Sequence, residues 1–158
     1  MKSNYPDDLT FLFLIDGMHG SLARKLRILG FDTTYERDLE DNELVQRAKK
    51  ERRILITSDL QLKVRARRSG IECVFVQGST DEQRLIELFS KIGFAARISC
   101  LSPRCSMCNG ALADTIDKTE YGVPISQCSE CGKRYWRGSH WKKLDDLFQG
   151  VDRSFMTK

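Results

Sequence analysis

The strongest constraint on the fold is an alternation, repeated four times before residue 94, of a strand-like segment with a segment of helical periodicity. The first and third strand-like segments are wholly apolar, as expected for strands buried on both faces of a parallel sheet. The predicted strands cover 11–15, 31–35, 54–56 and 73–76, and the predicted helices cover 19–29, 41–52, 60–68 and 80–92. This order is typical of a three-layer α/β domain with a mostly parallel sheet.

Local signals place the ends of these helices. Gly30 stands where a C-cap glycine belongs, Asp41 can cap the second helix, and Thr80 with Gln83 has the spacing of a capping box. Past about residue 99 the pattern stops, and cysteines, glycines and short β-like stretches continue until a last helix over 141–148. We therefore expect two domains, 1–98 and 99–158, the second being a small module with a C-terminal helix.

Composition narrows the class of protein. A content of 41% hydrophobic residues excludes a disordered polymer. No window approaches the roughly 20 apolar residues that span a bilayer, and the N-terminus lacks the features of a secretory leader. We expect a soluble cytoplasmic protein with no membrane partner. The net charge of +4 permits a polyanionic partner without demanding one.

Four cysteines form two pairs, Cys105-x-x-Cys108 and Cys128-x-x-Cys131, separated by nineteen residues. Each pair can present two thiolates from a tight turn, so together they predict a tetrahedral, structural Zn²⁺ site with no open position for water. Two disulfides or reactive thiols are the alternative, which a reducing compartment disfavours. Iron could use the same ligands, but nothing here indicates electron transfer.

Acidic residues follow the predicted strands at their carboxyl ends. Asp16 follows the first strand and Asp59 follows the third, while Asp41 and Glu43 begin the helix after the second strand. Such residues collect on one edge of an open parallel sheet, and clustered carboxylates suit Mg²⁺ or Mn²⁺. The pattern favours metal-assisted phosphodiester hydrolysis. For Asp41 and Glu43 taken singly, a helix cap and a solvated first-turn acid are the simpler explanations.

Basic residues near these acids favour a phosphate-bearing substrate. Arg24 and Arg27 lie on the helix after Asp16 and could hold phosphates. In the cysteine module, a segment mixes basic and aromatic side chains as single-stranded nucleic-acid platforms do: Lys133, Arg134, Tyr135, Trp136 and Arg137. Tyr135 and Trp136 could equally form the core of so small a module.

Four segments of the chain, 13–33, 53–59, 104–110 and 128–140, resemble the signatures of the Mut7-C ribonuclease domain family. The similarity runs in order over residues 11–147. It implies a PIN-like nuclease fold followed by a zinc ribbon, with ribonuclease activity. By position, Asp16 and Asp59 match the family's acidic residues, with Asp41 or Glu43 as the third, and the four cysteines match its zinc ligands. His140 lies in the last matched segment, where it could touch RNA or orient the ribbon. One departure is Ser58, where the family often has arginine.

Two functions from different classes follow. The first is a divalent-metal-dependent ribonuclease, cleaving within RNA chains, with catalytic Mg²⁺ or Mn²⁺ and structural Zn²⁺. The second is a non-catalytic zinc-ribbon factor that binds RNA or assists its processing, alone or within a larger complex. His19 follows the Asp16 loop and could reach a phosphate, but a metal-dependent mechanism needs no histidine base. A homodimer is compatible with the fold.

Overall fold

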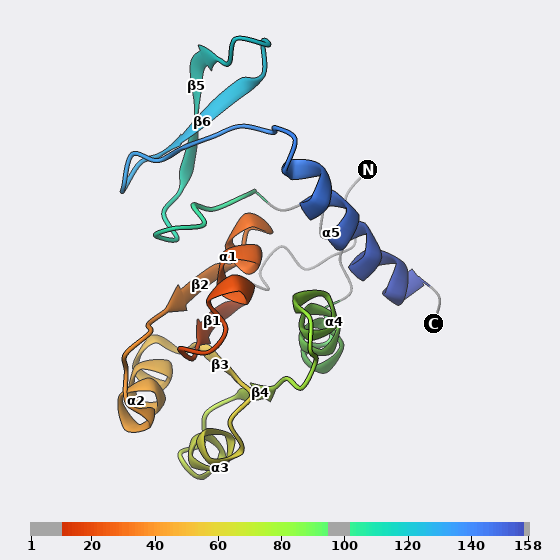
Figure 1. Ribbon diagram of the computed structural model, residues 1–158. Coiled ribbons are helices and arrows are strands. Elements are labelled where there is room, and N and C mark those ends of the chain that lie inside the picture. The colour runs from red at the N-terminus through yellow and green to blue at the C-terminus, as the bar shows by residue number, and fades with distance from the viewer. Residues whose placement is uncertain (1–10, 95–101, 157–158) are drawn as a thin grey trace, which may run out of the picture.

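Four parallel strands form the centre of the first part of the chain (Figure 1). The structure, a computed structural model, describes residues 11–94 and 102–156. The strands are β1 (Leu12–Ile15), β2 (Asp32–Tyr35), β3 (Ile54–Thr57) and β4 (Cys73–Phe75). Each lies within one residue of the range that its apolar or β-branched residues predict. The parallel sheet of the expected α/β fold is therefore confirmed.

The order of the strands is β2-β1-β3-β4, with β1 paired in parallel to both β2 and β3. The chain leaves β1 toward one side of the sheet and, after β2, returns past β1 to the other side. The strand order thus reverses between β1 and β3. In open α/β sheets, the crevice beyond the carboxyl ends of the strands at such a switch point is where ligands bind.

Helices cover both faces of the sheet, giving the three layers that the sequence predicts (Figure 1). Successive strand side chains point to opposite faces. The helices are α1 (Gly20–Ile28), α2 (Asp41–Glu51), α3 (Leu60–Arg68) and α4 (Asp81–Ile92). Phe13 and Ile15 pack with α1 and α4 on one face, whereas Leu14 and Leu55 pack with α2 and α3 on the other.

The predicted helix ends are correct in part. Gly30 has the positive φ of 103° expected just past a helix. Thr80 caps α4 by accepting a hydrogen bond from the Gln83 N–H at 3.2 Å, although the Gln83 amide reaches back to Ser79 N–H and not to Thr80. The cap of α2 is Glu40, one residue before the predicted Asp41, and the Glu43 carboxylate accepts from Glu40 N–H at 3.1 Å.

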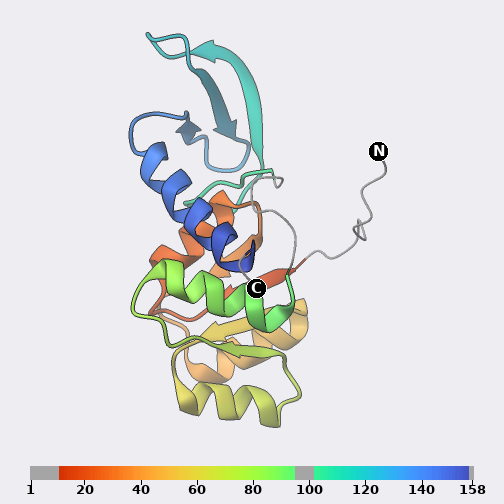
Figure 2. The same ribbon diagram turned by 90° about the vertical axis from the view of Figure 1, so that its right-hand side faces the viewer.

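The cysteine module forms a separate antiparallel sheet beyond one end of the first domain (Figure 2). Its strands are β5 (Leu112–Lys118), β6 (Pro124–Cys128) and β7 (Arg134–Tyr135), in that order across the sheet. We call residues 103–140, which contain this sheet and the four cysteines, the ribbon. The expected domain boundary at residues 98 and 99 lies outside the described residues.

The last helix, α5 (Trp141–Met156), extends well beyond the predicted end at residue 148. It packs against α4, and its buried Phe148 and Val151 join the same core cluster as Phe13 and Phe89. The helix that we expected to belong to the ribbon therefore contributes to the core of the first domain. Among the described residues, no helix has the length and apolarity needed to cross a bilayer.

Candidate active site and metal centre

Asp16 lies at the switch point, directly after β1, and is 4% exposed. Its Oδ1 accepts a hydrogen bond from the Met18 N–H at 3.0 Å, and its Oδ2 accepts from the hydroxyl of Thr57, the last residue of β3. The Asp16 N–H also donates to the Ile56 carbonyl oxygen at 3.3 Å, which ties the end of β1 to β3. The carboxylate is thus held in a fixed position by two strands.

Asp59 is joined to the same hydroxyl group. Its backbone N–H donates to Thr57 Oγ1 at 2.9 Å, so Thr57 links the Asp16 side chain to the start of α3. The Asp59 carboxylate caps α3, because its Oδ1 accepts from the N–H groups of Gln61 at 2.7 Å and Leu62 at 3.3 Å. The two aspartates predicted to share the sheet edge therefore stand on either side of one buried threonine.

Asp41 and Glu43 do not complete a carboxylate cluster. Within residues 11–94 and 102–156, the only group of three or more acidic, cysteine or histidine side chains close enough to hold an ion is the cysteine quartet. The physical reason is local, since Glu43 turns back to the N-terminus of its own helix to accept from Glu40. The expected gathering of three or four carboxylates is thus not present, and the catalytic roles of these residues remain predictions.

His19 and Ser58 form a polar pair beside Asp16 that the sequence did not indicate. His19 Nε2 lies 2.7 Å from Ser58 Oγ, and the Ser58 hydroxyl donates to the Val76 carbonyl oxygen at 2.5 Å. Because that hydroxyl has only one hydrogen to donate, His19 Nε2 is the donor of this pair. Burial lowers the pKa of His19, partly offset by the nearby carboxylate of Asp16. His19 is buried and supports the loop through Ser58, while its contact with a phosphate stays a prediction.

Two apolar side chains flank the acidic residues at the surface. Met18, two residues after Asp16, and Leu60, directly after Asp59, are both largely exposed. No hydrophobic pattern could single them out, because both follow the strands that carry the apolar periodicity.

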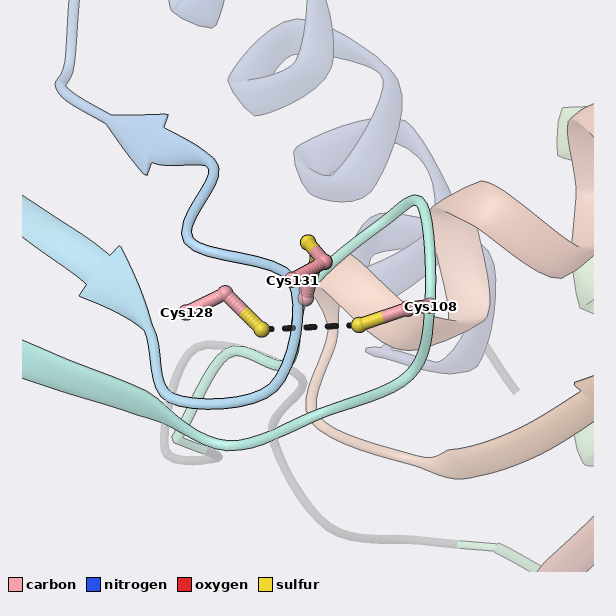
Figure 3. A group of neighbouring side chains, drawn as sticks. Cys108, Cys128 and Cys131 are labelled. Atoms are coloured by element: carbon pink, nitrogen blue, oxygen red, sulfur yellow. Dashed lines mark hydrogen bonds between the residues drawn. The ribbon is translucent and has the colours of Figure 1, made fainter.

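The four cysteine sulfurs of the ribbon lie within 4.8 Å of one another. Figure 3 shows three of these side chains, those of Cys108, Cys128 and Cys131. The distance between sulfurs is 3.6 Å for Cys105 and Cys131 and 3.4 Å for Cys108 and Cys128. Both distances are far longer than a disulfide bond of about 2.05 Å, and they approach the roughly 3.8 Å between sulfurs of a tetrahedral site with Zn–S bonds of about 2.3 Å. The donor set and spacing fit a structural zinc ion.

The turn that follows each cysteine pair contains a residue in the left-handed conformation. Asn109 and Gly132, which follow the two pairs, have positive φ angles of 71° and 76°. Cys105 is fully buried and its sulfur lies 3.0 Å from the Tyr135 hydroxyl. Tyr135 therefore contacts the cysteine centre. This contact favours the alternative that Tyr135 forms part of the core of the ribbon.

Arg27, predicted to hold a phosphate, instead attaches the ribbon to the first domain. It is buried, and its guanidinium donates to the carbonyl oxygens of Thr33 at 2.8 Å, Ser106 at 3.0 Å and Met107 at 3.2 Å. The Asn109 side chain adds hydrogen bonds to Thr33 N–H and to the Asp32 carboxylate. These carbonyl groups take three of the five N–H donors of the Arg27 guanidinium. Arg27 thus has a structural role between the two domains, and its contact with a phosphate stays a prediction.

The other predicted RNA-contacting residues are accessible. Arg24 is exposed on α1. In the ribbon and the turn before α5, the exposed residues of the predicted set are Lys133, Arg134, Trp136, Arg137 and His140. Arg134 forms an ion pair with Asp117. Contact of these residues with RNA stays a prediction.

An open parallel α/β domain with an aspartate at its switch point, joined to a four-cysteine ribbon, defines the class of this protein. The chain belongs to the Mut7-C RNAse domain family, whose model matches residues 12–148. This match spans both domains and agrees with the resemblance of the sequence motifs. It indicates a function related to nucleases. Comparisons with curated proteins and with solved structures gave no match.

Proposed function

We propose that this protein is a divalent-metal-dependent ribonuclease that cleaves within RNA chains at the edge formed by Asp16 and Asp59. The observation that carries the proposal is the arrangement around Thr57, whose hydroxyl group bonds both the Asp16 carboxylate and the Asp59 N–H. A buried carboxylate fixed in this way at a switch point is poorly explained by solubility or by packing.

The two aspartates fit the requirements of Mg²⁺ or Mn²⁺. A carboxylate has about four lone-pair sites, so the bonds to Met18, Thr57 and the α3 backbone leave both carboxylates with acceptor capacity. Mg²⁺ commonly binds through one or two carboxylates, several waters and the substrate phosphates. When bound, such an ion would stabilise charge on the scissile phosphate and activate a water molecule.

Residues of this chain would perform the remaining tasks. Thr57 keeps the Asp16 carboxylate in one orientation, and the His19–Ser58 pair supports the loop beside it. Helix α1 begins directly after this loop with no side-chain cap and no acidic residue in its first turn, so its N-terminal N–H groups can receive a phosphate oxygen. Exposed Arg24, one turn further along α1, would contact a neighbouring phosphate.

Substitution of Asp16 by asparagine tests the proposal, because Asp16→Asn preserves shape while removing the negative charge. We expect the rate of Mn²⁺-dependent cleavage of a single-stranded RNA to fall by more than about 100-fold. Substitution of residues that only support metal ligands already lowers metal affinity or activity by about 10–100-fold. Asp146→Asn, at an exposed position of α5, is the matched control and should cleave at the wild-type rate. Undiminished cleavage by Asp16→Asn would remove this edge from the mechanism.

A second function is favoured by one observation. Both aspartates already accept hydrogen bonds from protein groups, and the part of the chain that the structure describes gathers no third carboxylate around them. These features suit a non-catalytic factor that binds RNA through its ribbon. Such a factor would show salt-sensitive RNA binding, no Mn²⁺-dependent cleavage, and unchanged binding after substitution of Asp16 and Asp59.

A further inference from the structure

A cleft of about 520 Å³ lies where the ribbon meets α1 and α5. Figure 2 shows these three elements together at the end of the molecule away from α2 and α3. This size is within the range of about 300–1,000 Å³ typical of small-ligand sites. Its lining comes from Ile28 of α1, from Leu144 of α5 and from ribbon residues that include Leu112, Val123 and Pro124. The cleft is distinct from the acidic edge.

Aromatic rings and cations dominate the part of this lining nearest β7. Tyr135, Trp136 and Trp141 line the cleft, and Trp136 is 49% exposed. The Arg137 guanidinium lies 4.9 Å from the centre of the Trp141 ring, and Lys133 Nζ lies 5.8 Å from that of Tyr135. Aromatic rings with cationic side chains beside them are the surfaces on which unpaired bases bind.

The charge of the lining has one sign. Five of its described residues are basic or histidine, and none is acidic: Arg104, Lys133, Arg134, Arg137 and His140. Arg134 is paired with Asp117, and Arg104 lies 3.8 Å from Asp32 and donates to the Asn109 carbonyl oxygen. Lys133 and Arg137, whose contacts are with ring faces, are thus the cations best placed to meet a phosphate.

We infer that this cleft binds an unpaired base of single-stranded RNA, stacked against Trp136 and Trp141, with its flanking phosphates on Lys133 and Arg137. The inference rests on the proposed function in taking RNA as the substrate. Double-stranded RNA does not fit, because its bases are paired and stacked within the helix and cannot enter the cleft.

Helix α1 connects this base-binding cleft to the acidic edge. Ile28 lines the cleft at one end of α1, and Gly20 follows the Asp16 loop at the other. At 1.5 Å per residue these ends are about 12 Å apart. Arg24 lies midway, on the same helix face as Ile28 because it is four residues away. A strand anchored in the cleft can therefore pass Arg24 and reach Asp16.

The test uses the tryptophan fluorescence of the zinc-loaded protein. The chain has two tryptophans, and both line the cleft, so their emission reports on it. The zinc-loaded Asp16→Asn variant, without added Mg²⁺ or Mn²⁺, is titrated with an eight-nucleotide single-stranded oligouridine. We expect saturable quenching of the tryptophan emission. Trp136→Ala should raise the dissociation constant for the RNA about fivefold or more, because one stacked base usually contributes at least this much to the affinity. Arg137→Gln should lower the slope of affinity against salt by about 0.7.

The matched control is Tyr121→Ala, which removes an aromatic ring that is 85% exposed on the β5–β6 turn and outside the lining. It should bind as tightly as its parent. Wild-type affinity in Trp136→Ala with normal zinc content, or equal affinity for a blunt RNA duplex, would overturn the inference. So would a dimer that Trp136→Ala dissociates, because the cleft would then be a contact between copies. Binding is measured without cleavage, so a failure of the ribonuclease proposal leaves this result unaffected.

Discussion

The sequence indicates where Asp16 and Asp59 lie, but it does not indicate that the Thr57 hydroxyl group connects them. Asp16 and Asp59 were predictable because each follows an apolar strand that ends abruptly. Their connection through Thr57 was not, since it depends on the register that places Ile15 beside Ile56. The structural role of Arg27 was not predictable for a related reason: its partners Ser106 and Met107 lie about 80 residues away, so its burial depends on how the ribbon docks.

At this scale the buried histidine leads to a prediction about pH. Burial, only partly offset by Asp16 and Asp81, lowers the pKa of His19 below 6.5, so the neutral form is favoured in the folded protein. The unfolded chain therefore binds the proton more readily, and stability is lost as the pH falls below 6.5 and through the lower folded value. His19→Gln removes this titration.

Thermal unfolding between pH 8 and pH 5, with zinc retention monitored, measures the effect. The melting temperature of the wild type should fall more steeply on acidification than that of His19→Gln, where 1 kcal/mol corresponds to about 2–4 °C for a chain of this size. Every other residue is the same in the two proteins, so the contributions of the other residues cancel in the comparison. Parallel pH profiles would contradict the role assigned to burial.

Among the secondary-structure elements, the alternation of strands and helices was predictable and the position of α5 was not. Periodicity identifies which residues of a helix are apolar, but it does not identify the surface that they cover. Phe148 and Val151 pack with the core of the first domain, although the helix follows the ribbon in the chain. The cap of α2 was misplaced by one residue because glutamate at this position is a weaker cap signal than aspartate.

Helix α3 allows the two roles of Asp59 to be separated. Its carboxylate caps the helix, and in our proposal it also binds the catalytic metal. Asparagine is as good a cap as aspartate, whereas alanine costs about 1 kcal/mol. Urea unfolding should therefore show a loss of about 1 kcal/mol for Asp59→Ala and almost none for Asp59→Asn, while both lose Mn²⁺-dependent cleavage. Normal cleavage by Asp59→Asn would assign the carboxylate to capping alone.

At the scale of the whole molecule, hydrogen bonds and helix α5 attach the ribbon to the first domain. Arg27 and Asn109 fix the first cysteine turn against β2, and α5 returns the chain to the core. The two-part organisation was evident in the sequence, since helical periodicity ends where the cysteines begin. The cleft between the parts was not, because it is created by contacts between residues far apart in the chain.

The claim that an ion binds at the edge between β1 and β3 is tested most directly by titrating zinc-loaded protein with Mn²⁺ while recording the electron paramagnetic resonance of the free ion. We predict that the wild type binds Mn²⁺ at a site that Asp16→Asn weakens by at least about tenfold, with zinc content unchanged. Identical Mn²⁺ binding by the wild type and Asp16→Asn would contradict it.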